Sequence, residues 1–287
     1  DGDGARRELR PHADGVRTAR LPRHARRDGS SVVGLGLGRR PDGDADRPLI
    51  SDENGNWFRG DIVGILCAQY LQVENIVTPV SSNTLVEKSK LFSQVARTRI
   101  GSPFVIEQMQ NLLDNGKQHV AGYEANGGFL SADELSTNGK QLSALPTRDA
   151  LIVILSLLHL SKTKSCRMSE LIGELPQRFT HSDRIKEIPS DKSMALLNSY
   201  LDKNKNMTNE TQQKFLNDFS QAFAQDIHIL NANAIDGLRV TLSNEDIVHL
   251  RPSGNAPEFR CYTESDNFDN AYLLNQKILN MVKQILS

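Results

Sequence analysis

Apolar residues recur at helix and strand spacing along most of the chain after residue 60. Residues 61–71 place Ile62, Ile65 and Leu66 on one helical face, which predicts a helix. Before this helix, Asn54–Gly55 separates two short segments and predicts a hairpin turn. Further strands are predicted over 75–80, 97–100 and within 117–129, and further helices over 81–96, 102–116 and 147–165. This alternation of helices and strands favours an α/β domain with a largely parallel sheet.

The pattern changes character near residue 173. Residues 175–190 are interpreted as a linker with strand fragments. Helical spacing returns at 193–204 and 209–223, and short strands are predicted around Leu238–Leu242, Asp246–Arg251 and Phe259–Thr263. Residues 267–286 form an amphipathic pattern that predicts a closing helix. Strands grouped together with helices around them indicate a second domain of the α+β class.

Composition is that of a globular protein and disfavours several function classes. The chain has 287 residues, 38% apolar residues and a net charge of −1, so it carries no signature of nucleic-acid binding. The longest apolar run, residues 150–160, is too short to span a bilayer, and no signal peptide is visible at the N-terminus. Cys67, Cys166 and Cys261 have no metal-binding spacing, which predicts reduced, mostly buried thiols in a cytoplasmic protein.

Residues 1–40 differ sharply in composition from the rest of the chain. They contain ten arginines, seven glycines, no lysine and no Phe, Trp or Tyr, whereas ordinary composition begins after Pro41. Such a segment cannot bury enough apolar surface to offset its ordering entropy. Three interpretations stay open: a basic tail for an anionic partner, a solvated disordered tail, or non-native sequence from out-of-frame translation.

The segment DGDADR, residues 42–47, holds three carboxylates followed by an arginine. Asp42, Asp44 and Asp46 can converge on one divalent cation if the backbone curls, and hard oxygen ligands suit Mg²⁺ together with a phosphate. A solvated acidic turn is the simpler interpretation. An EF-hand is disfavoured, because its sixth loop position is Arg47 where glycine is required.

Two glycine-containing loops carry further candidate binding residues. GYEANGGF, residues 122–129, presents Glu124 and Asn126, whose carboxylate and amide can hold neighbouring sugar hydroxyls. RPSGNAPEFR, residues 251–260, can form a phosphate nest. Its candidate phosphate-binding residues are Arg251, Ser253, Gly254 and Asn255. The simpler interpretations are a tight turn for the first loop and a proline-rich hairpin turn for the second.

Residues 97–102, RTRIGS, give a weaker signal. Arg97 and Arg99 alternate on a predicted strand and therefore share one face. That face is either solvated, which is the favoured interpretation, or it points toward a phosphate, with Arg99 as the possible ligand.

The order of these motifs resembles that of the α-D-phosphohexomutases. An Asp-x-Asp-x-Asp-Arg loop, then a Gly-x-Glu-x-Asn-Gly loop, then Arg-x-Ser-Gly-Asn-x-Pro extend from about Asp42 to the end of the chain. The resemblance is strongest to the phosphomannomutase/phosphoglucomutase branch, and phosphoglucosamine mutases are more distant.

The resemblance implies a division into family domains. Residues 41–60 would be the metal-binding loop and hairpin at the end of mutase domain II. Residues 61–175 would be the α/β sugar-binding domain III, with a mixed sheet, and residues 176–287 the α+β phosphate-binding domain IV, which is TBP-like in the family. Residues 1–40 would remain a disordered or non-native segment.

The resemblance also implies residue roles. Asp42, Asp44 and Asp46 would ligate Mg²⁺, and Arg47 would support the phosphoryl group in transfer. Glu124 and Asn126 would read the sugar hydroxyls, while the Arg251 loop would hold the phosphate that is not being transferred. The implied activity is an isomerase that moves phosphate between mannose 1-phosphate and mannose 6-phosphate, or the glucose equivalents. A phosphoserine and a bisphosphorylated hexose, which also serves as primer, would be the intermediates.

The sequence departs from the family before Asp42. The family's serine lies in a Thr-x-Ser-His-Asn-Pro loop well ahead of the acidic motif, whereas here Ser30 and Ser31 have no His-Asn-Pro after them. The first domain is therefore expected to be missing, and this chain alone is expected to be inactive. The alternatives are a truncated, non-catalytic sugar-phosphate-binding module, or a phosphoglucosamine mutase. In each case the expected partner is a small hexose phosphate, with no nucleic acid and no membrane, and oligomeric state stays open.

Overall fold

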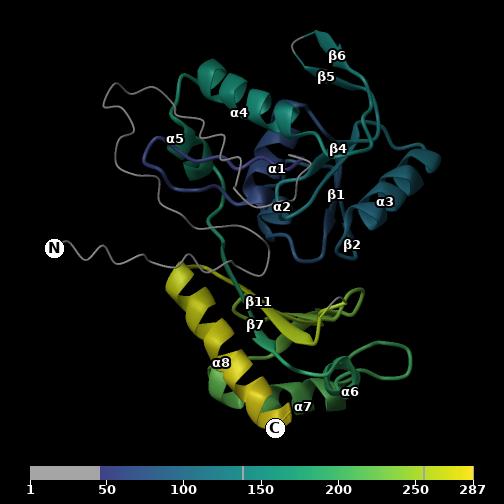
Figure 1. Cartoon of the computed structure of the whole chain (residues 1–287), viewed down its shortest axis with the longest axis vertical. Coiled ribbons are helices and arrows are strands. Elements are labelled where there is room, and N and C mark those ends of the chain that lie inside the picture. Colours follow the sequence, from purple (N-terminus) through teal and green to yellow (C-terminus); the bar gives the residue numbers. More distant parts are fainter. Residues whose placement is uncertain (1–45, 138, 255, 287) are drawn as a thin grey trace, which may run out of the picture.

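The computed structural model describes residues 46–137, 139–254 and 256–286 of the chain. The described chain forms two lobes, each built on its own sheet, and passes from one to the other through residues 174–178 (Figure 1). The predicted mixed α/β character is confirmed, because helices and several sheets are combined in one structure.

The first lobe contains a four-stranded mixed sheet. Its strands are β1 (Asn75–Pro79), β2 (Gln94–Thr98), β3 (Val120–Tyr123) and β4 (Phe129–Ser131). The order across the sheet is β2-β1-β3-β4, with β1 parallel to both β2 and β3, and β4 antiparallel to β3. The largely parallel sheet expected from helix–strand alternation is therefore present, and β4 supplies the antiparallel edge.

Helices cover both faces of this sheet. They are α1 (Gly60–Tyr70), α2 (Leu85–Lys88), α3 (Ser102–Asp114), α4 (Ala150–Lys164) and α5 (Met168–Gly173). The strands are buried on both sides, so neighbouring residues of β1 serve different cores. Ile76 packs with the α1 and α4 side chains, whereas Val77 packs with Val105 and Met109 of α3.

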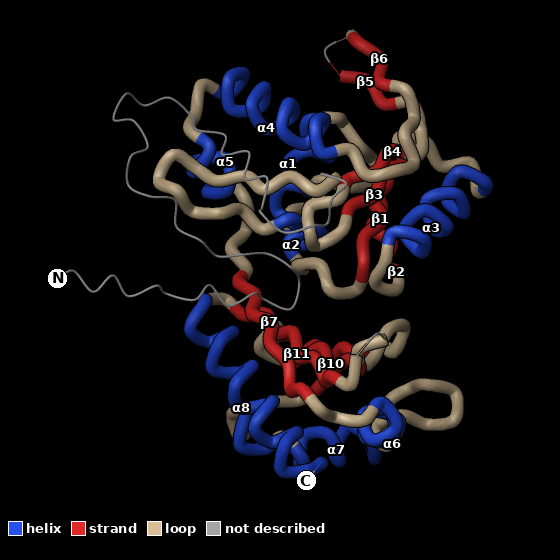
Figure 2. Tube along the Cα trace, in the orientation of Figure 1, coloured by secondary structure: helices blue, strands red, loops and turns tan. Residues whose placement is uncertain are grey.

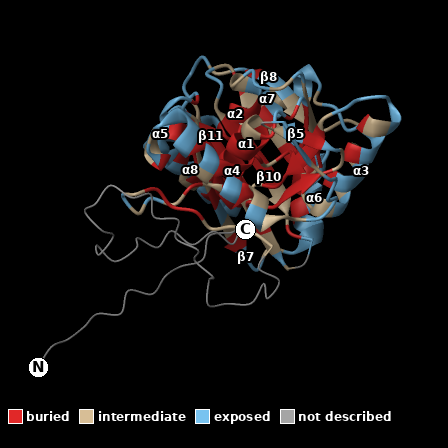
Figure 3. Ribbon diagram, turned by 90° about the horizontal axis from the view of Figure 1, so that it is seen from above, coloured by how far each residue is buried: buried red, intermediate tan, exposed pale blue. Residues whose placement is uncertain are grey.

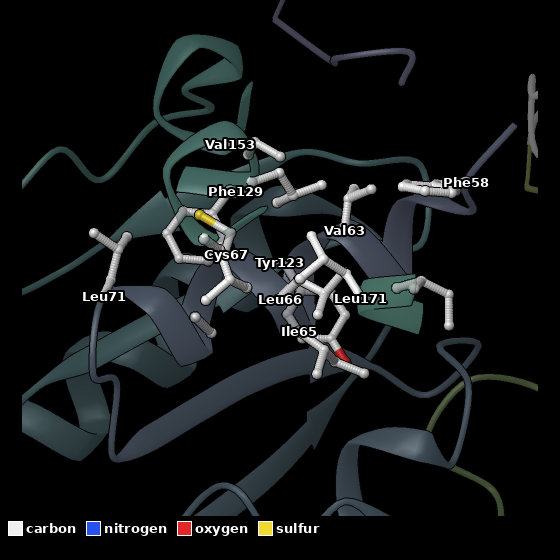
Figure 4. Packing of buried hydrophobic residues seen from close by; sticks show 14 of the residues in the cluster. Phe58, Val63, Ile65, Leu66, Cys67, Leu71, Tyr123, Phe129, Val153 and Leu171 are labelled. Atoms are coloured by element: carbon white, nitrogen blue, oxygen red, sulfur yellow. The ribbon is translucent and has the colours of Figure 1, made fainter. Parts of the chain in front are cut away.

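The core between the sheet, α1 and α4 is continuous. Figure 4 shows Ile65 and Leu66 of α1 beside Tyr123 of β3, with Val153 of α4 and Leu171 of α5 around them. Each fully buried aliphatic side chain of this kind contributes roughly 1.5–3 kcal/mol relative to an exposed one. Seen from above, the buried residues gather around the sheets while the outer side of α3 is exposed (Figure 3).

Two short hairpins project from the first lobe. The turn predicted at Asn54–Gly55 is present, with Gly55 at φ +80° and one bridge between Ser51 and Trp57. The Asp52 carboxylate accepts hydrogen bonds from the backbone N–H groups of Asn54 and Asn56 at 2.9 and 2.8 Å. The second hairpin pairs two strands near the tip of the lobe, β5 (Leu135–Thr137) and β6 (Lys140–Leu142).

The second lobe is an antiparallel sheet with helices packed against it. Its strands are β7 (Phe179–Lys186), β8 (Ile229–Asn233), β9 (Leu238–Leu242), β10 (Ile247–Pro252) and β11 (Glu258–Ser265), in the order β7-β11-β10-β9-β8. Its helices are α6 (Ser190–Asn198), α7 (Asn209–Asp218), the short η1 (Ser220–Ala222) and α8 (Phe268–Leu286). Figure 2 shows α6 and α7 on the side of the sheet away from the first lobe.

Buried polar groups join the two lobes. The Glu264 carboxylate of β11 accepts from the backbone N–H and hydroxyl of Thr84 in the first lobe, the former at 3.0 Å. It also accepts from Arg178 Nε at 2.9 Å, and both side chains are 5% exposed. Asn83 Nδ2 donates to Arg178 O at 3.0 Å. The junction is therefore held by hydrogen-bonded charge and not by apolar contact alone.

Three predicted elements are corrected by the structure. The helix predicted over 81–96 is limited to the four residues of α2, because Lys90 takes the left-handed region at φ +55° and the chain then enters β2. The strand predicted over 97–100 is accordingly Gln94–Thr98, paired in parallel with β1. The linker predicted over 175–190 contains one continuous strand, β7, paired along its whole length with β11.

Two further expectations concern the cysteines and membranes. All three cysteines are free, and Cys67 and Cys261 are buried, as predicted, while Cys166 is partly exposed. Among the described residues, no helix combines the length and the apolar character needed to cross a membrane.

Candidate functional site

The loop between β3 and β4 is a compact turn that buries Glu124. The Glu124 N–H donates to Gly128 O at 2.8 Å, and the Gly127 N–H donates to Glu124 O at 3.0 Å. Asn126 Oδ1 accepts from the Gly128 N–H at 3.1 Å, so the amide oxygen of Asn126 is used inside the loop. Glu124 is only 4% exposed at the end of β3.

Close backbone packing fixes this loop against two other segments. A Cβ atom added at Gly60, the first residue of α1, would stand 2.1 Å from Gly127 N. A Cβ atom added at Gly127, which has φ +99°, would stand 3.3 Å from Pro48 O. The loop therefore lies between the start of α1 and the segment that directly follows the acidic motif.

Arg148 joins the acidic motif to this loop. Its Nε donates to Glu124 Oε2 at 2.6 Å, and its Nη1 donates to Asp46 Oδ2 at 2.9 Å. Arg47 Nε donates to the other Asp46 oxygen, Oδ1, at 3.1 Å. The three residues Asp46, Arg148 and Glu124 are hereafter called the Arg148 bridge.

The start of α4 positions Arg148. The next residue, Asp149, caps the helix by accepting from the N–H groups of Leu151 and Ile152 at 2.9 and 3.0 Å. The Asp149 N–H donates to Phe129 O of β4 at 2.9 Å, which ties the helix start to the sheet. A Cβ atom at Gly128 would stand 2.9 Å from Arg148 Cδ, so the glycine leaves the space that the arginine stem occupies.

The charges of the Arg148 bridge support one another. Burial alone raises the pKa of the Asp46 carboxyl, but the hydrogen bonds and positive charges of Arg148 and Arg47 outweigh it and lower that pKa. Burial also acts to lower the pKa of Arg148, but its hydrogen bonds to Glu124 and Asp46 and their negative charges outweigh burial and raise that pKa. The Arg148 guanidinium and the Asp46 carboxylate are therefore charged near neutral pH.

A second cluster lies in the other lobe and is hereafter called the Arg251 pair. Arg251 Nε of β10 donates to Asp236 Oδ1 at 2.7 Å. Asp236 Oδ2 accepts from the Ile100 N–H of the first lobe at 2.9 Å, and Asp236 O accepts from His249 Nε2 at 2.7 Å. Asp236 thus connects the predicted phosphate-binding arginine with the RTRIGS segment.

The turn around Asp236 depends on its neighbouring glycine. Gly237 has φ +79°, and a Cβ atom there would stand 2.2 Å from Leu250 O. Strand register places Arg251 opposite Arg260, and Arg260 opposite Arg184, so the three arginines form a row on one face. Arg260 Nε is buried without a hydrogen-bond partner among the described residues, while the Glu258 carboxylate pairs with both Arg184 and Arg260, at 3.3 and 3.5 Å. Part of the positive charge of this row is therefore balanced within the sheet.

The remaining predicted phosphate-binding residues lie beside Arg251. Ser253 is 5% exposed, and its N–H donates to Glu258 O at 2.8 Å. Gly254 is exposed, with nothing within 4 Å of an added Cβ atom. Asn255 lies outside the described residues, so its predicted role stays a prediction.

The two arginines of RTRIGS have different surroundings. Arg97 donates to Glu87 and to the carbonyl oxygens of Pro79 and Ser82, so its guanidinium is held by contacts within the first lobe. Arg99 is exposed and lies over the Phe104 ring, 4.5 Å from the ring centroid. Its predicted phosphate role remains a prediction.

The predicted metal ligands are only partly visible. Asp42 and Asp44 lie outside the described residues, and within the described part no three His, Cys, Asp or Glu side chains gather as a metal site. Asp46 fits the donor chemistry of Mg²⁺, because each of its oxygens accepts only one described hydrogen bond and keeps a second lone pair.

Two residues of these clusters were missed by the sequence analysis. Arg148 lies at the start of the helix predicted over 147–165, directly before the capping residue Asp149. Its only signal in the sequence is a charge beside a long apolar run. Asp236 precedes Gly237, an Asp-Gly pair that signals a turn but not a partner for an arginine. A cavity of about 480 Å³ also opens near the junction, lined by Trp57, Phe179 and Phe268 among others, but not by either cluster.

Comparisons with known proteins agree with the motifs. Residues 59–179 match the family model described as phosphoglucomutase/phosphomannomutase, alpha/beta/alpha domain III. A phosphomannomutase from Salmonella muenchen is 45% identical over 246 residues, covering 85% of this chain and 48% of the relative. A phosphoglucosamine mutase from Clostridium botulinum (strain Alaska E43 / Type E3) is 29% identical over 245 residues, covering 82% and 44%.

A solved structure shares the fold. The N-acetylphosphoglucosamine mutase of Aspergillus fumigatus, in complex with GlcNAc-6P and magnesium, matches with a TM-score of 0.55 at 14% identity, covering 84% of this chain and 47% of that chain. The chain spans about half the length of the curated relatives that it matches.

Proposed function

Because the chain belongs to the α-D-phosphohexomutase family, we propose that it binds a hexose phosphate and serves the isomerase reaction of that family. The reaction would move a phosphoryl group between two positions of mannose or glucose phosphate. The observation that carries the proposal is the Arg148 bridge, in which the last carboxylate of the acidic motif and the sugar-loop carboxylate share one arginine. Arg148 thus contacts two motifs that are 78 residues apart, from Asp46 to Glu124, which supports the proposal that they serve one site.

The sugar would be held on the first lobe. Glu124 is buried at the end of a strand, and a carboxylate there accepts hydrogen bonds from ring hydroxyls. The loop that carries Glu124 is rigid because Gly60 and Gly127 allow direct backbone packing. A rigid support of this kind fixes the orientation of the bound sugar.

The phosphate that is not being transferred would be held on the second lobe. Arg251 is oriented through its Nε by Asp236, and its Nη1 and Nη2 have no hydrogen-bond partner among the described residues. These two nitrogens suit the fork-like recognition of a phosphate. Ser253 and the glycine that follows it would add hydroxyl and backbone donors.

The transfer end would lie at the acidic motif. Asp42, Asp44 and Asp46 would hold Mg²⁺, which when bound neutralises charge on phosphoryl oxygens. Arg47 already contacts Asp46 and would donate to the group in transfer. In the family this transfer uses a phosphoserine and a bisphosphorylated hexose. No Thr-x-Ser-His-Asn-Pro loop occurs in the 287 residues, so we expect these residues alone to bind without turnover.

The proposed domain assignment follows the family. Residues 41–60 would complete mutase domain II, 61–175 would be domain III, and 176–287 would be the TBP-like domain IV. The family also suggests a cytoplasmic protein. A phosphoglucosamine mutase is the second candidate, favoured by the 29% identity to such an enzyme.

Calorimetric titration of the 287-residue chain with mannose 6-phosphate tests the binding. Arg251→Ala is expected to weaken the affinity at least about tenfold, because a charged hydrogen bond contributes roughly 1.5–3 kcal/mol. Lys214→Ala is the matched control, since Lys214 is also ion-paired but lies on α7. Equal affinity of Arg251→Ala and the unaltered chain would refute the clamp.

Turnover is tested separately. Mannose 1-phosphate is incubated with the chain, Mg²⁺ and a hexose bisphosphate primer, and the formation of mannose 6-phosphate is measured. We expect none above background. Measurable conversion would show that the chain contains a phosphoryl carrier outside the family motif.

A further inference from the structure

The predicted partner of Glu124 in sugar recognition does not present its oxygen to a ligand. Asn126 Oδ1 accepts from the Gly128 N–H inside the loop, which leaves only its amide nitrogen for other contacts. The Asn126 amide can therefore donate to a hydroxyl but cannot accept from one, and the donor that directly contacts Glu124 is on another residue. Arg148 is in direct contact with Glu124, at 2.6 Å.

The contact uses only part of each group. Arg148 engages Nε and Nη1, and Glu124 engages Oε2. Among the described residues, neither Arg148 Nη2 nor Glu124 Oε1 has a hydrogen-bond partner. Nη2 shares one edge of the planar guanidinium with Nε, so this donor lies on the side that faces Glu124. One donor and one acceptor are thus presented next to each other.

We propose that Arg148 is a further specificity-determining residue, which together with Glu124 binds two neighbouring hydroxyl groups of the hexose. The inference rests on the proposed function, because it names how the same site recognises its sugar. Nη2 donates to one hydroxyl oxygen, and Glu124 Oε1 accepts from the other hydroxyl. A vicinal diol matches this arrangement, whereas an isolated phosphate does not need the acceptor.

Burial makes the pair selective. The side chains of Glu124 and Arg148 are 6% and 23% exposed, so an analogue that lacks a hydroxyl leaves a largely desolvated charged group without a partner. Sites built to hydrogen-bond a hydroxyl reject such analogues far more strongly than apolar pockets do. Selectivity for hydroxyl position therefore resides at this pair, and affinity for phosphate resides at Arg251.

An arginine is required by the geometry. It reaches Asp46 and Glu124 at once and still has a nitrogen left, because the guanidinium carries its donors in a fixed fork. A lysine places three donors on one nitrogen and cannot span both carboxylates in the same way. Lysine keeps the charge, however, which separates electrostatics from geometry in an experiment.

Calorimetry measures the affinity of the 287-residue chain for four ligands. They are glucose 6-phosphate, its 3-deoxy analogue, its 4-deoxy analogue and inorganic phosphate. The unaltered chain is expected to bind at least one deoxy analogue about tenfold or more weakly than the parent sugar. Arg148→Met is expected to abolish this discrimination and to leave inorganic phosphate binding unchanged. Arg148→Lys is expected to lose most of the discrimination as well.

Arg251→Ala is the reciprocal control. It should weaken all phosphate ligands alike and leave the ratio between parent and deoxy sugar unchanged. Discrimination that survives in both Arg148 variants, or an equal loss for sugar phosphate and inorganic phosphate, would overturn the assignment of Arg148 while leaving the proposed function standing. If the unaltered chain binds no sugar phosphate at all, the proposed function itself fails. Urea unfolding shows whether each variant is folded. If Arg148→Met does not fold, the discrimination measured with Arg148→Lys tests the role of Arg148.

Discussion

The Arg148 bridge and the Arg251 pair both join arginine to carboxylate, but they differ in the number of carboxylates that each arginine contacts. In the bridge one arginine serves two carboxylates, so one nitrogen and one carboxylate oxygen remain for a ligand. In the pair one carboxylate serves one arginine through a single nitrogen, and two guanidinium nitrogens remain. On the proposals above, the first arrangement suits a neutral, hydroxyl-rich group and the second suits an anion, so the number of carboxylates around each arginine would set which ligand it binds.

The two clusters also differ in what holds them. The bridge lies within the first lobe and its segments pack together there through Gly60, Gly127 and Gly128. The pair receives support from both lobes, because Asp236 also accepts from the Ile100 N–H. We therefore expect changes between the lobes to affect the Arg251 pair more than the Arg148 bridge.

The largest effect is expected from Asp236→Ala. The Asp236 side chain is 10% exposed, and its removal leaves Arg251 and the Ile100 N–H without their acceptor. Breaking a buried ion pair on one side costs about 3–4 kcal/mol of unfolding free energy. Urea unfolding and calorimetry with inorganic phosphate measure the two consequences. Asp246→Ala is the control, because Asp246 is bonded to Asn244 and not to an arginine. A loss below about 1 kcal/mol would show that Arg251 is held by other means.

The next effect is an acid sensitivity of the second lobe. His249 is buried, and its burial lowers its pKa to about 4, with Arg239 and Arg251 acting in the same direction and Asp236 against it. Tyr262 stacks on the ring at 5.3 Å between centroids. Between pH ~6.5 and ~4 the unfolded chain binds a proton at this histidine that the folded chain does not, so acid favours unfolding.

The size of this effect follows from the pKa difference. The folded chain is expected to lose on the order of 3 kcal/mol through His249 as the pH falls from ~6.5 to ~4. His249→Gln keeps a donor for Asp236 O but does not titrate, so its unfolding free energy should depend less on pH over that range. Parallel stability profiles for the two proteins, measured by urea unfolding, would contradict the prediction.

A smaller effect is expected from Gly128→Ala, which disturbs the Arg148 bridge and not the Arg251 pair. In Gly128→Ala the new Cβ atom would stand 2.9 Å from Arg148 Cδ, so the arginine must shift. Overpacking of this kind costs about 2 kcal/mol. Sugar discrimination should fall while inorganic phosphate affinity stays. Gly173→Ala is the matched control, since nothing lies within 4 Å of an added Cβ atom there. Unchanged discrimination in Gly128→Ala would mean that Arg148 can relax without loss.

Much of the fold follows from periodicity alone. The helices predicted over 61–71, 102–116 and 267–286 correspond to α1, α3 and α8. α3 and α8 bury one apolar stripe each, whereas α1 is buried nearly all round. The helix predicted over 81–96 fails, because the amphipathic spacing is local while β2 is stabilised by pairing with β1, a contact distant in sequence. The sequence predicts a linker where β7 lies for the same reason: only two of its eight residues are buried, and its pairing partner β11 lies far along the chain.

The sequence predicts the loops that carry the candidate site residues, but not the ion pairs that these residues form. Glu124, Asp46 and Arg251 stand in motifs whose residue types announce their chemistry. Arg148 and Asp236 lie in segments that predict a helix start and a turn, and their proposed roles depend on contacts with Glu124 and Arg251, which are 24 and 15 residues away. A local pattern carries no information on such partners, so only the folded chain shows them.

The smallest effect is expected at the surface between the lobes. Lys88 Nζ of the first lobe donates to Glu245 of the second at 2.7 Å, but the two side chains are 31% and 61% exposed. An exposed ion pair contributes below about 1 kcal/mol, because water screens the charges and two long side chains lose freedom. Lys88→Ala should therefore lower the unfolding free energy only slightly, leave phosphate affinity unchanged, and lose even this effect at high salt. Lys88→Ala could instead weaken inorganic phosphate binding as strongly as Asp236→Ala does. The first lobe would then support Arg251 through the whole junction, and not through the single contact between Asp236 and Ile100.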